Sequence, residues 1–359
     1  HPSHILQDKG RVLAFFVYFC KKGLEKVATA KRRQYAWANN VGTPQHKVLN
    51  AHAMPSCPLK IAIFGNECQL HNERAIARVV QCLAQHKAEV CVDEPFLDYL
   101  RQSGNLPTYP LTPFAGNDFE AQLALSLGGD GTFLKAAGRI GQKQIPIVGI
   151  NMGRLGFLAD VPASKAEDAL NEIFDGEYRI EEHVVMKVEA GNESFGGNPF
   201  AVNDIAILKR DDASMITIGV RVDGERLITY QADGLIVATQ AGSTAYNLSN
   251  GGPIVAPNTN ALCLTAVAPH SLNVRPIVLP DNVELQLSVE SRSHNYLVAI
   301  DGRSTKLVQG VDIHISKAPY VVKQVRRNNQ TYFATLRNKM MWGADSRNAD
   351  MPNSHSEEG

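Results

Sequence analysis

The residues best suited to chemistry form the run Gly-Gly-Asp-Gly-Thr at positions 128–132, directly after the apolar segment 121–127. Glycines remove side-chain bulk, so successive backbone N–H groups can converge on phosphate oxygens. We expect Thr132 to cap a following helix, whose positive N-terminal end also favours an anion. A carboxylate there repels phosphate unless it binds metal or takes up a proton, so Asp130 is a candidate for either role. The alternative interpretation of the run is a tight Gly-Asp-Gly turn that has no chemical role.

The elements that would position this run alternate between short apolar strands and amphipathic helices. The pattern predicts strands at 59–65, 88–92, 121–127 and 145–150, and helices at 73–86, 133–140 and 165–174. Such alternation favours a parallel α/β layer structure. Residues 94–118 are rich in Pro, Gly and Asn, and we expect a loop there near the site.

The sequence pattern changes after residue 183 to short segments rich in β-branched residues, separated by turn signals such as Asp223-Gly224. The predicted strands are 183–190, 200–208, 216–223, 226–230, 234–239, 262–268, 283–290, 297–300 and 311–316. They indicate an all-β domain of two packed sheets. Residues 319–343 return to mixed character, and the polar tail from Asp345 is expected to be disordered.

Composition narrows the function classes. Hydrophobic residues make up 44% of the 359 residues and charged residues 20%, which is typical of a globular protein. A formal net charge of zero gives no electrostatic reason to expect a nucleic-acid partner. The six cysteines show no CxxC pair and no zinc-type spacing, so we expect reduced thiols and a cytoplasmic protein. The apolar run 12–20 is shorter than the roughly 20 residues that span a bilayer, so no membrane partner is expected.

The first 53 residues differ from the rest of the chain. They carry nine Lys or Arg against two acidic residues, a net charge of +7, so the remaining residues carry −7. We interpret this segment as an extension upstream of a natural start at Met54. A basic organelle-targeting segment is the alternative interpretation.

Further motifs resemble a known family. The Gly-Gly-Asp-Gly-Thr run is shared by NAD kinases, by diacylglycerol- and sphingosine-type lipid kinases and, in related form, by phosphofructokinases, so alone it indicates only phosphoryl transfer. The runs Ala-Asp-Gly-Leu-Ile-Val-Ala-Thr at 232–239 and Gly-Ser-Thr-Ala-Tyr at 242–246 resemble NAD kinases of the bacterial type. The pair Asn203-Asp204 and the stretches 149–158 and 268–276 are also similar to that family. The resemblance covers about residues 59–345 in the right order.

The resemblance implies a fold and a reaction. The fold would be a Rossmann-like or phosphofructokinase-like α/β N-terminal domain followed by an all-β C-terminal sandwich domain. The reaction would transfer the γ-phosphate of ATP to the adenosine 2′-hydroxyl of NAD and give NADP, with Asp130 as general base. The family also implies Mg²⁺ as the divalent cation that accompanies ATP, and a homodimer or homotetramer formed through the β domain.

The resemblance also assigns binding residues. Asn203 and Asp204 would hold adenine and ribose, because an amide suits a base edge and a carboxylate accepts from two hydroxyls. Gln231 and Asp233 would approach the nicotinamide half, and residues 244–249 would wrap the adenosine. The assigned residues are Gly131, Lys135, Asn203, Asp204, Ser214, Gln231, Asp233, Thr244, Ala245, Tyr246, Asn247, Leu248, Ser249, Ala268 and Arg303. For Ser214 the family places the contact across the dimer interface, and Lys135 also suits a solvated helix position.

The expected domain organisation follows from these assignments. It comprises a basic extension over 1–58, an α/β nucleotide-binding domain over 59–160 and an all-β NAD-binding domain over 161–318. A return segment, 319–344, would pack on the α/β domain and precede the tail 345–359.

Two departures from the family pattern leave alternatives open. Asp204 stands where the family usually has Glu, and Gln240-Ala241 stands where it usually has Pro-Thr, which changes the turn expected near the nicotinamide half. A dinucleotide-binding module without catalysis is therefore one alternative. A lipid kinase is another, although such enzymes usually follow the glycine run with an Asn-Glu pair, whereas Phe133-Leu134 follows here.

Overall fold

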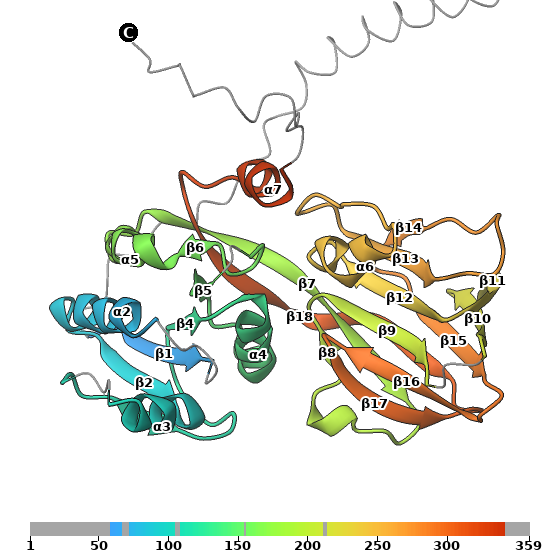
Figure 1. Cartoon of the computed structure of the whole chain (residues 1–359), viewed down its shortest axis with the longest axis horizontal. Coiled ribbons are helices and arrows are strands. Elements are labelled where there is room, and N and C mark those ends of the chain that lie inside the picture. The colour runs from blue at the N-terminus through green and yellow to red at the C-terminus, as the bar shows by residue number, and fades with distance from the viewer. Residues whose placement is uncertain (1–57, 67–71, 105–107, 154–155, 211–213, 342–359) are drawn as a thin grey trace, which may run out of the picture. The chain divides into compact units, whose positions relative to one another are not determined.

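The computed structural model describes residues 58–66, 72–104, 108–153, 156–210 and 214–341 (Figure 1). All of them belong to one compact unit, residues 53–359. The predicted upstream extension and the predicted polar tail lie outside the described residues, as do Cys20, Cys57 and Cys68.

The N-terminal part is the α/β layer structure that the sequence predicts. Five parallel strands follow the order β5-β4-β1-β2-β3. They are β1 (Lys60–Gly65), β2 (Glu89–Asp93), β3 (Thr112–Phe114), β4 (Leu123–Leu127) and β5 (Ile147–Asn151), with the short β6 (Val161–Pro162) beside β5. The helices are α2 (Glu73–Gln85), α3 (Glu94–Gln102), α4 (Asp130–Ile140) and α5 (Ala166–Phe174). β4 and β5 are buried along their whole length, which explains their continuous apolar sequences.

The prediction of a loop over residues 94–118 is wrong. Residues 94–102 form α3, and residues 112–114 form β3, which pairs with β2. Phe96, Leu97 and Leu100 are buried on one side of α3, at helical spacing. Pro95 is compatible with the helix because it lies in the first turn, where a backbone N–H has no intrahelical partner.

The C-terminal part consists of two packed sheets, as predicted. Within the described residues one sheet has six antiparallel strands in the order β14-β13-β12-β9-β16-β17. Its strands are β9 (Asp204–Lys209), β12 (Gly234–Thr239), β13 (Ala261–Val267), β14 (Ile277–Pro280), β16 (Asn295–Ile300) and β17 (Arg303–Val308). Leu264 and Val298 from this sheet share one core cluster with Ile218 and Leu287 from the other sheet. β14 and β17 were not predicted.

The other sheet continues from the α/β part into the sandwich. β18 (Ile313–Arg327) pairs in parallel with β5 at Gln324, and antiparallel with β7 (Tyr178–Ala190) and β15 (Leu285–Glu290). Beyond β15 lie β10 (Ile216–Val222) and β11 (Glu225–Ala232), and β8 (Phe200–Ala201) pairs with β7. β7 and β18 run side by side over most of their length (Figure 1). The expected domain boundary at residue 318 falls inside β18.

The chain returns from β18 to a last helix, α7 (Tyr332–Met340). Thr331 caps it, because its hydroxyl oxygen accepts a hydrogen bond from the Ala334 N–H at 3.2 Å. Thr335 and Leu336 are the buried residues of α7. The ring of Tyr332, the first residue of α7, lies 6.2 Å from the ring of Phe157.

Candidate functional site

The glycine run forms the turn between β4 and α4. Gly129 is the N-cap residue and α4 begins at Asp130, three residues earlier than predicted. Thr132 therefore lies inside the first turn, and no side chain caps this helix, so the capping role predicted for Thr132 is wrong. Added Cβ atoms at Gly129 and Gly131 would meet no atom within 4 Å, so the turn leaves open space above its backbone. A cleft of about 290 Å³ occupies that space, and Lys135 also lines it.

The carboxylate of Asp130 is held by three consecutive backbone N–H groups. Oδ2 accepts from Phe157 at 2.9 Å, and Oδ1 accepts from Leu158 at 3.0 Å and from Ala159 at 2.8 Å. Gly156 must lack a side chain, because a Cβ there would collide with the carboxylate. A carboxylate has about four acceptor positions. The arrangement fixes the orientation of Asp130 and leaves one position, on Oδ2, for a further donor.

A lysine from the last helix faces the same carboxylate. Lys339 Nζ lies 3.8 Å from Asp130 Oδ2 and 4.4 Å from the centroid of the Phe157 ring. The side chains of Lys339 and Asp130 are about one third exposed, at 32% and 30%. Sequence reasoning missed Lys339, because it belongs to no motif and lies more than 200 residues from Asp130.

Lys135 lies one turn into α4 and lines the cleft. Its ammonium is 3.3 Å from Oδ2 of Asp93, the fully buried last residue of β2. Arg139, one turn further along α4, pairs with the other carboxylate oxygen of Asp93. Lys135 is thus directed toward Asp93 in this structure, with 45% of its side chain exposed to the cleft.

A second carboxylate, Asp301, fixes the Asn203-Asp204 pair in the same manner. It accepts hydrogen bonds from the N–H groups of Val202 at 2.8 Å, Asn203 at 2.8 Å and Asp204 at 3.1 Å. Burial raises the pKa of Asp301, while these three donors lower it. The side-chain oxygen of Asn203 is buried and has no partner within the described structure. Asp301 is a positioning residue that motif comparison did not assign.

Asp204 is buried, with only 7% of its surface exposed. Burial, with a smaller contribution from the negative charge of Asp301, raises the pKa of Asp204 to about 7. Its charge therefore depends on pH near neutrality. A ligand donor that reached this carboxylate would favour its ionised form.

The turn after β12 packs directly on this pair. The Thr239 N–H donates to the Asn203 carbonyl at 2.9 Å. Gly242 approaches the backbone of Asn203 so closely that a Cβ would collide with it. The structure thus brings Asn203 together with Thr244 and Ala245, which are half-buried, and with Tyr246, which is 38% exposed at the start of α6 (Tyr246–Ser249).

Asn247, also predicted to bind nucleotide, points into the protein. Its amide donates to the carbonyls of Ser243 at 3.2 Å and Pro253 at 3.1 Å. Its side-chain oxygen accepts from the Thr265 hydroxyl at 2.6 Å. The structure therefore gives Asn247 the position of a residue that shapes the turn. Its neighbours Leu248 and Ser249 are half-buried and exposed, respectively.

Gln240 and Ala241, the two residues that depart from the family pattern, line a small hollow of about 20 Å³ between the turn and the loop that holds Asp130. Phe157, Arg326 and Tyr332 line the same hollow. The side-chain oxygen of Gln240, Nε of Arg326 and the Tyr332 hydroxyl are buried without a hydrogen-bond partner in the described structure. The volume suits about one water molecule, which such groups can bind.

Four predicted residues gather elsewhere, at one end of β10, β11 and β13. The Gln231 carbonyl accepts a hydrogen bond from the His270 N–H at 2.9 Å. The Asp233 N–H donates to the Val267 carbonyl at 2.9 Å. These two bonds bring Gln231 and Asp233 close to Ala268. Ser214 precedes Ile216, which pairs with Ala232 at the same end. Lys209 Nζ lies 3.0 Å from Oδ1 of Asp233.

Arg303 does not join this group. Its guanidinium donates to the carbonyls of Asn198 at 3.2 Å and Phe200 at 3.1 Å. It lines a cavity of about 390 Å³ together with Gly131 and Lys135. Arg303 is thus placed on the α4 side of the site.

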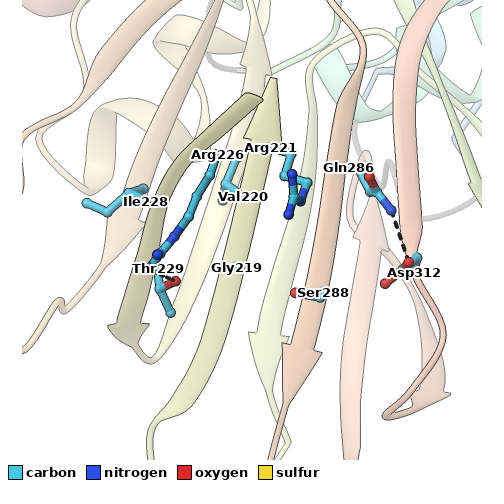
Figure 2. A pocket seen from close by; sticks show the side chains of 9 residues that line it. All are labelled: Gly219, Val220, Arg221, Arg226, Ile228, Thr229, Gln286, Ser288 and Asp312. Atoms are coloured by element: carbon cyan, nitrogen blue, oxygen red, sulfur yellow. Dashed lines mark hydrogen bonds between the residues drawn. The ribbon is translucent and has the colours of Figure 1, made fainter. Parts of the chain in front are cut away.

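One more hollow, of about 240 Å³, lies on the face of β10, β11 and β15 (Figure 2). Gln286, Arg221 and Arg226, three of the polar residues that line it, already have hydrogen-bond partners. Gln286 donates to Asp312 at 3.0 Å, Arg221 donates to the Gly224 carbonyl at 2.8 Å, and Arg226 contacts Thr229 at 3.4 Å. None of the predicted site residues lines it, so it is separate from the candidate site.

The part of the chain that the structure describes has neither a metal-binding cluster nor a membrane-spanning helix. It contains no cluster of three or more His, Cys, Asp or Glu side chains that could hold a metal ion. Its helices are all too short or too polar to cross a membrane.

Comparison with known proteins gives consistent matches. The model of the ATP-NAD kinase N-terminal domain matches residues 61–178, and that of the ATP-NAD kinase C-terminal domain matches residues 202–327. An NAD kinase of Bacteroides fragilis is 50% identical over 289 residues, which cover 80% of this chain and 100% of that protein. An NAD kinase of Cytophaga hutchinsonii is 38% identical over 289 residues, 80% of this chain and 99% of its own.

Two solved structures are similar in fold. An NAD kinase from Archaeoglobus fulgidus in complex with ATP has a TM-score of 0.62 at 26% identity, over 79% of this chain and 99% of that chain. Yeast NADH kinase complexed with NADH has a TM-score of 0.71 at 22% identity, over 81% and 90% of the two chains.

Proposed function

This chain belongs to the NAD kinase family, and from that premise we propose the roles of its residues in one reaction. The protein is an ATP-dependent kinase that phosphorylates NAD to NADP. The observation that carries the mechanism is the carboxylate of Asp130, which three N–H groups orient at the open end of α4.

Asp130 acts as the general base. The adenosine 2′-hydroxyl of NAD donates to the remaining acceptor position on Oδ2, and its proton passes to Asp130 as its oxygen attacks the γ-phosphorus of ATP. The bond between the γ-phosphorus and the β–γ bridging oxygen breaks, and ADP leaves. A base of this kind contributes about 10²–10⁴-fold to the rate. Positioning and charge neutralisation supply the rest, since phosphoryl transfer needs little covalent work from the protein.

Asn203 and Asp204 hold the adenosine of NAD. The orphaned side-chain oxygen of Asn203 is a ready acceptor for the adenine amino group. The ionised carboxylate of Asp204 accepts from ribose hydroxyls, and the adjoining turn, with Thr244, Ala245 and Tyr246, covers the base. This role makes NAD binding sensitive to pH near 7, because the pKa of Asp204 is raised to about 7.

The phosphates of ATP occupy the cleft above Gly129 and Gly131, with Lys135 at its rim. We propose Mg²⁺ as the divalent cation, which the phosphates of ATP themselves would hold in this cleft. This fits the usual preference of Mg²⁺ for one or two carboxylates plus substrate phosphates. When bound, it neutralises charge on the β- and γ-phosphates.

We further propose a cytoplasmic homodimer or homotetramer formed through the β domain. Ser214, Gln231, Asp233 and Ala268 lie at one end of β10, β11 and β13, strands of the two packed sheets, as a surface that meets a single dinucleotide would require. In that assembly Ser214 reaches the site of a neighbouring subunit, and Gln231 and Asp233 contact the nicotinamide half of the dinucleotide.

The test combines purified protein with NAD, ATP and Mg²⁺ and measures NADP with an NADP-specific dehydrogenase. Wild-type protein should form NADP, and Asp130→Asn should lower kcat by about 10²–10⁴-fold while NAD still binds. Protein that binds NAD without forming NADP would instead be a dinucleotide-binding module. Parallel reactions with NADH as acceptor and polyphosphate as donor define the substrate range.

A further inference from the structure

We propose that Lys339 is a further catalytic residue, whose ammonium contacts the phosphoryl group as it passes to the 2′-hydroxyl. The proposal rests on the function proposed above, and it assigns a role to a residue of the C-terminal helix that no family motif includes. Its basis is the position of Lys339 Nζ, 3.8 Å from Asp130 Oδ2.

That position coincides with the reaction centre. A hydroxyl that gives its proton to Asp130 must lie about 2.6–3.2 Å from a carboxylate oxygen. Oδ2 keeps one free acceptor position, because backbone N–H groups occupy the others, and Oδ2 is the oxygen near which Lys339 Nζ lies. An ammonium 3.8 Å from that oxygen is therefore close to the attacking oxygen and to the phosphorus that it meets.

The ammonium of Lys339 is available to contact an incoming phosphate oxygen. Lys135, the other lysine at the glycine run, is 3.3 Å from the buried carboxylate of Asp93. Lys339 Nζ is too far from Asp130 for a hydrogen bond, and its side chain is 32% exposed. A flexible, partly exposed ammonium can move the short distance to an incoming phosphate oxygen. Charge on the equatorial oxygens of the transferring group then has a cation opposite it.

The fold holds Lys339 at this place. Thr331 caps α7, and Leu336 within the helix is buried. The Tyr332 ring lies 6.2 Å from the ring of Phe157, the residue whose N–H binds Asp130. The ammonium of Lys339 also lies 4.4 Å from the centre of the Phe157 ring. α7 is thus docked on the loop that orients the base.

A packing role for Lys339 is the competing explanation, since its stem also covers Phe157. Lys339→Met keeps an unbranched apolar side chain over the ring and removes the charge. Lys339→Arg keeps a charge. Arg337→Ala is the matched control, because Arg337 is an exposed cation on the same helix.

The decisive measurement compares the affinities of each variant for NADP and for NAD by calorimetry. The two ligands differ by the 2′-phosphate, which is the transferred group. Lys339→Met should bind NADP about tenfold more weakly, as expected for loss of one charge-assisted contact, and NAD unchanged. Its kcat should fall about 10–100-fold with little change in the KM for NAD. Lys339→Arg should retain most of both properties, and Arg337→Ala should match the wild type.

Equal affinities of Lys339→Met and wild type for NADP would overturn the proposal, as would equal weakening for NAD and NADP, which indicates packing. If both Lys339 variants lose the same kcat, the charge is not the cause and the proposal also fails. Wild-type protein that forms no NADP would refute the proposed function itself. The difference between NADP and NAD affinity still tests Lys339 in that case.

Discussion

Replacement of Asp204 by Asn should stabilise the protein and weaken its substrate binding at the same time. Asp204 is 7% exposed, and burial together with the charge of Asp301 raises its pKa from 3.8 to about 7. Above that pH the folded protein carries a negative charge in a site that disfavours it. Asparagine keeps the shape of the side chain and removes the charge.

The magnitude follows from the pKa shift. A rise of about 3 units corresponds to about 4 kcal/mol of unfavourable free energy when the carboxylate is ionised. The folded state of the wild type binds a proton that the unfolded state has already released between pH 3.8 and about 7, so its stability falls as pH rises through that window. The variant lacks this dependence. Its advantage should reach about 4 kcal/mol at most above pH 8 and vanish near pH 4.

The assay is urea unfolding of both proteins at pH 8.5 and pH 5.0, at one protein concentration because assembly also affects stability. The midpoint of the variant should exceed that of the wild type at pH 8.5, and the difference should shrink at pH 5.0. The KM for NAD should rise in the variant at pH 8.5, since the amide keeps only one of the two acceptor oxygens for ribose hydroxyls and has no negative charge.

Asp233→Asn is the control. Asp233 is half-buried and paired with Lys209, so its replacement should not stabilise the protein. An Asp204→Asn variant that is equally stable or less stable than the wild type at pH 8.5 would refute the reasoning. So would a gain that does not depend on pH, because a buried charge could not then be its source.

Two further substitutions test the carboxylate positions. Gly156→Ala should lower kcat by about 10²-fold, because its methyl group collides with the Asp130 carboxylate, whereas NAD affinity measured by calorimetry should change little. An unchanged kcat would show that the carboxylate need not stay where the structure places it. Asp301→Asn should destabilise the fold by about 1–3 kcal/mol in urea unfolding and raise the KM for NAD, since in either orientation its NH2 group faces a backbone N–H donor, that of Val202 or those of Asn203 and Asp204. A rise in KM without destabilisation would instead assign Asp301 a direct contact with substrate.

The sequence predicts the local elements better than their connections. Hydrophobic periodicity located β1, β4 and α2 within about two residues, because each buries a continuous apolar face. α3 was missed because the composition of the segment outweighed the spacing of Phe96, Leu97 and Leu100. The pairing of β18 with β5 could not be predicted, since it joins residues far apart in the chain.

The same limit applies to the candidate site. Asp130 was identified from local spacing alone. Its three hydrogen-bond donors lie 27 to 29 residues away, and Asp301 lies 97 to 99 residues from the loop that it holds. Lys339 reaches the site only through the position of α7. The sequence thus predicted which carboxylate could take part in the chemistry. The groups that orient each carboxylate could not be predicted, because they depend on tertiary contacts.

The parallel pairing of β18 with β5 has a consequence for synthesis on the ribosome. β5 ends at residue 151, and its neighbour β18 begins only at residue 313. At about 5–20 residues per second, the part of the β5 edge that β6 leaves unpaired waits on the order of ten seconds for that partner. An unpaired strand edge is a template for association between chains. The nascent chain therefore passes through a period in which its first half depends on a chaperone or on low concentration, and truncation before residue 313 makes that period permanent.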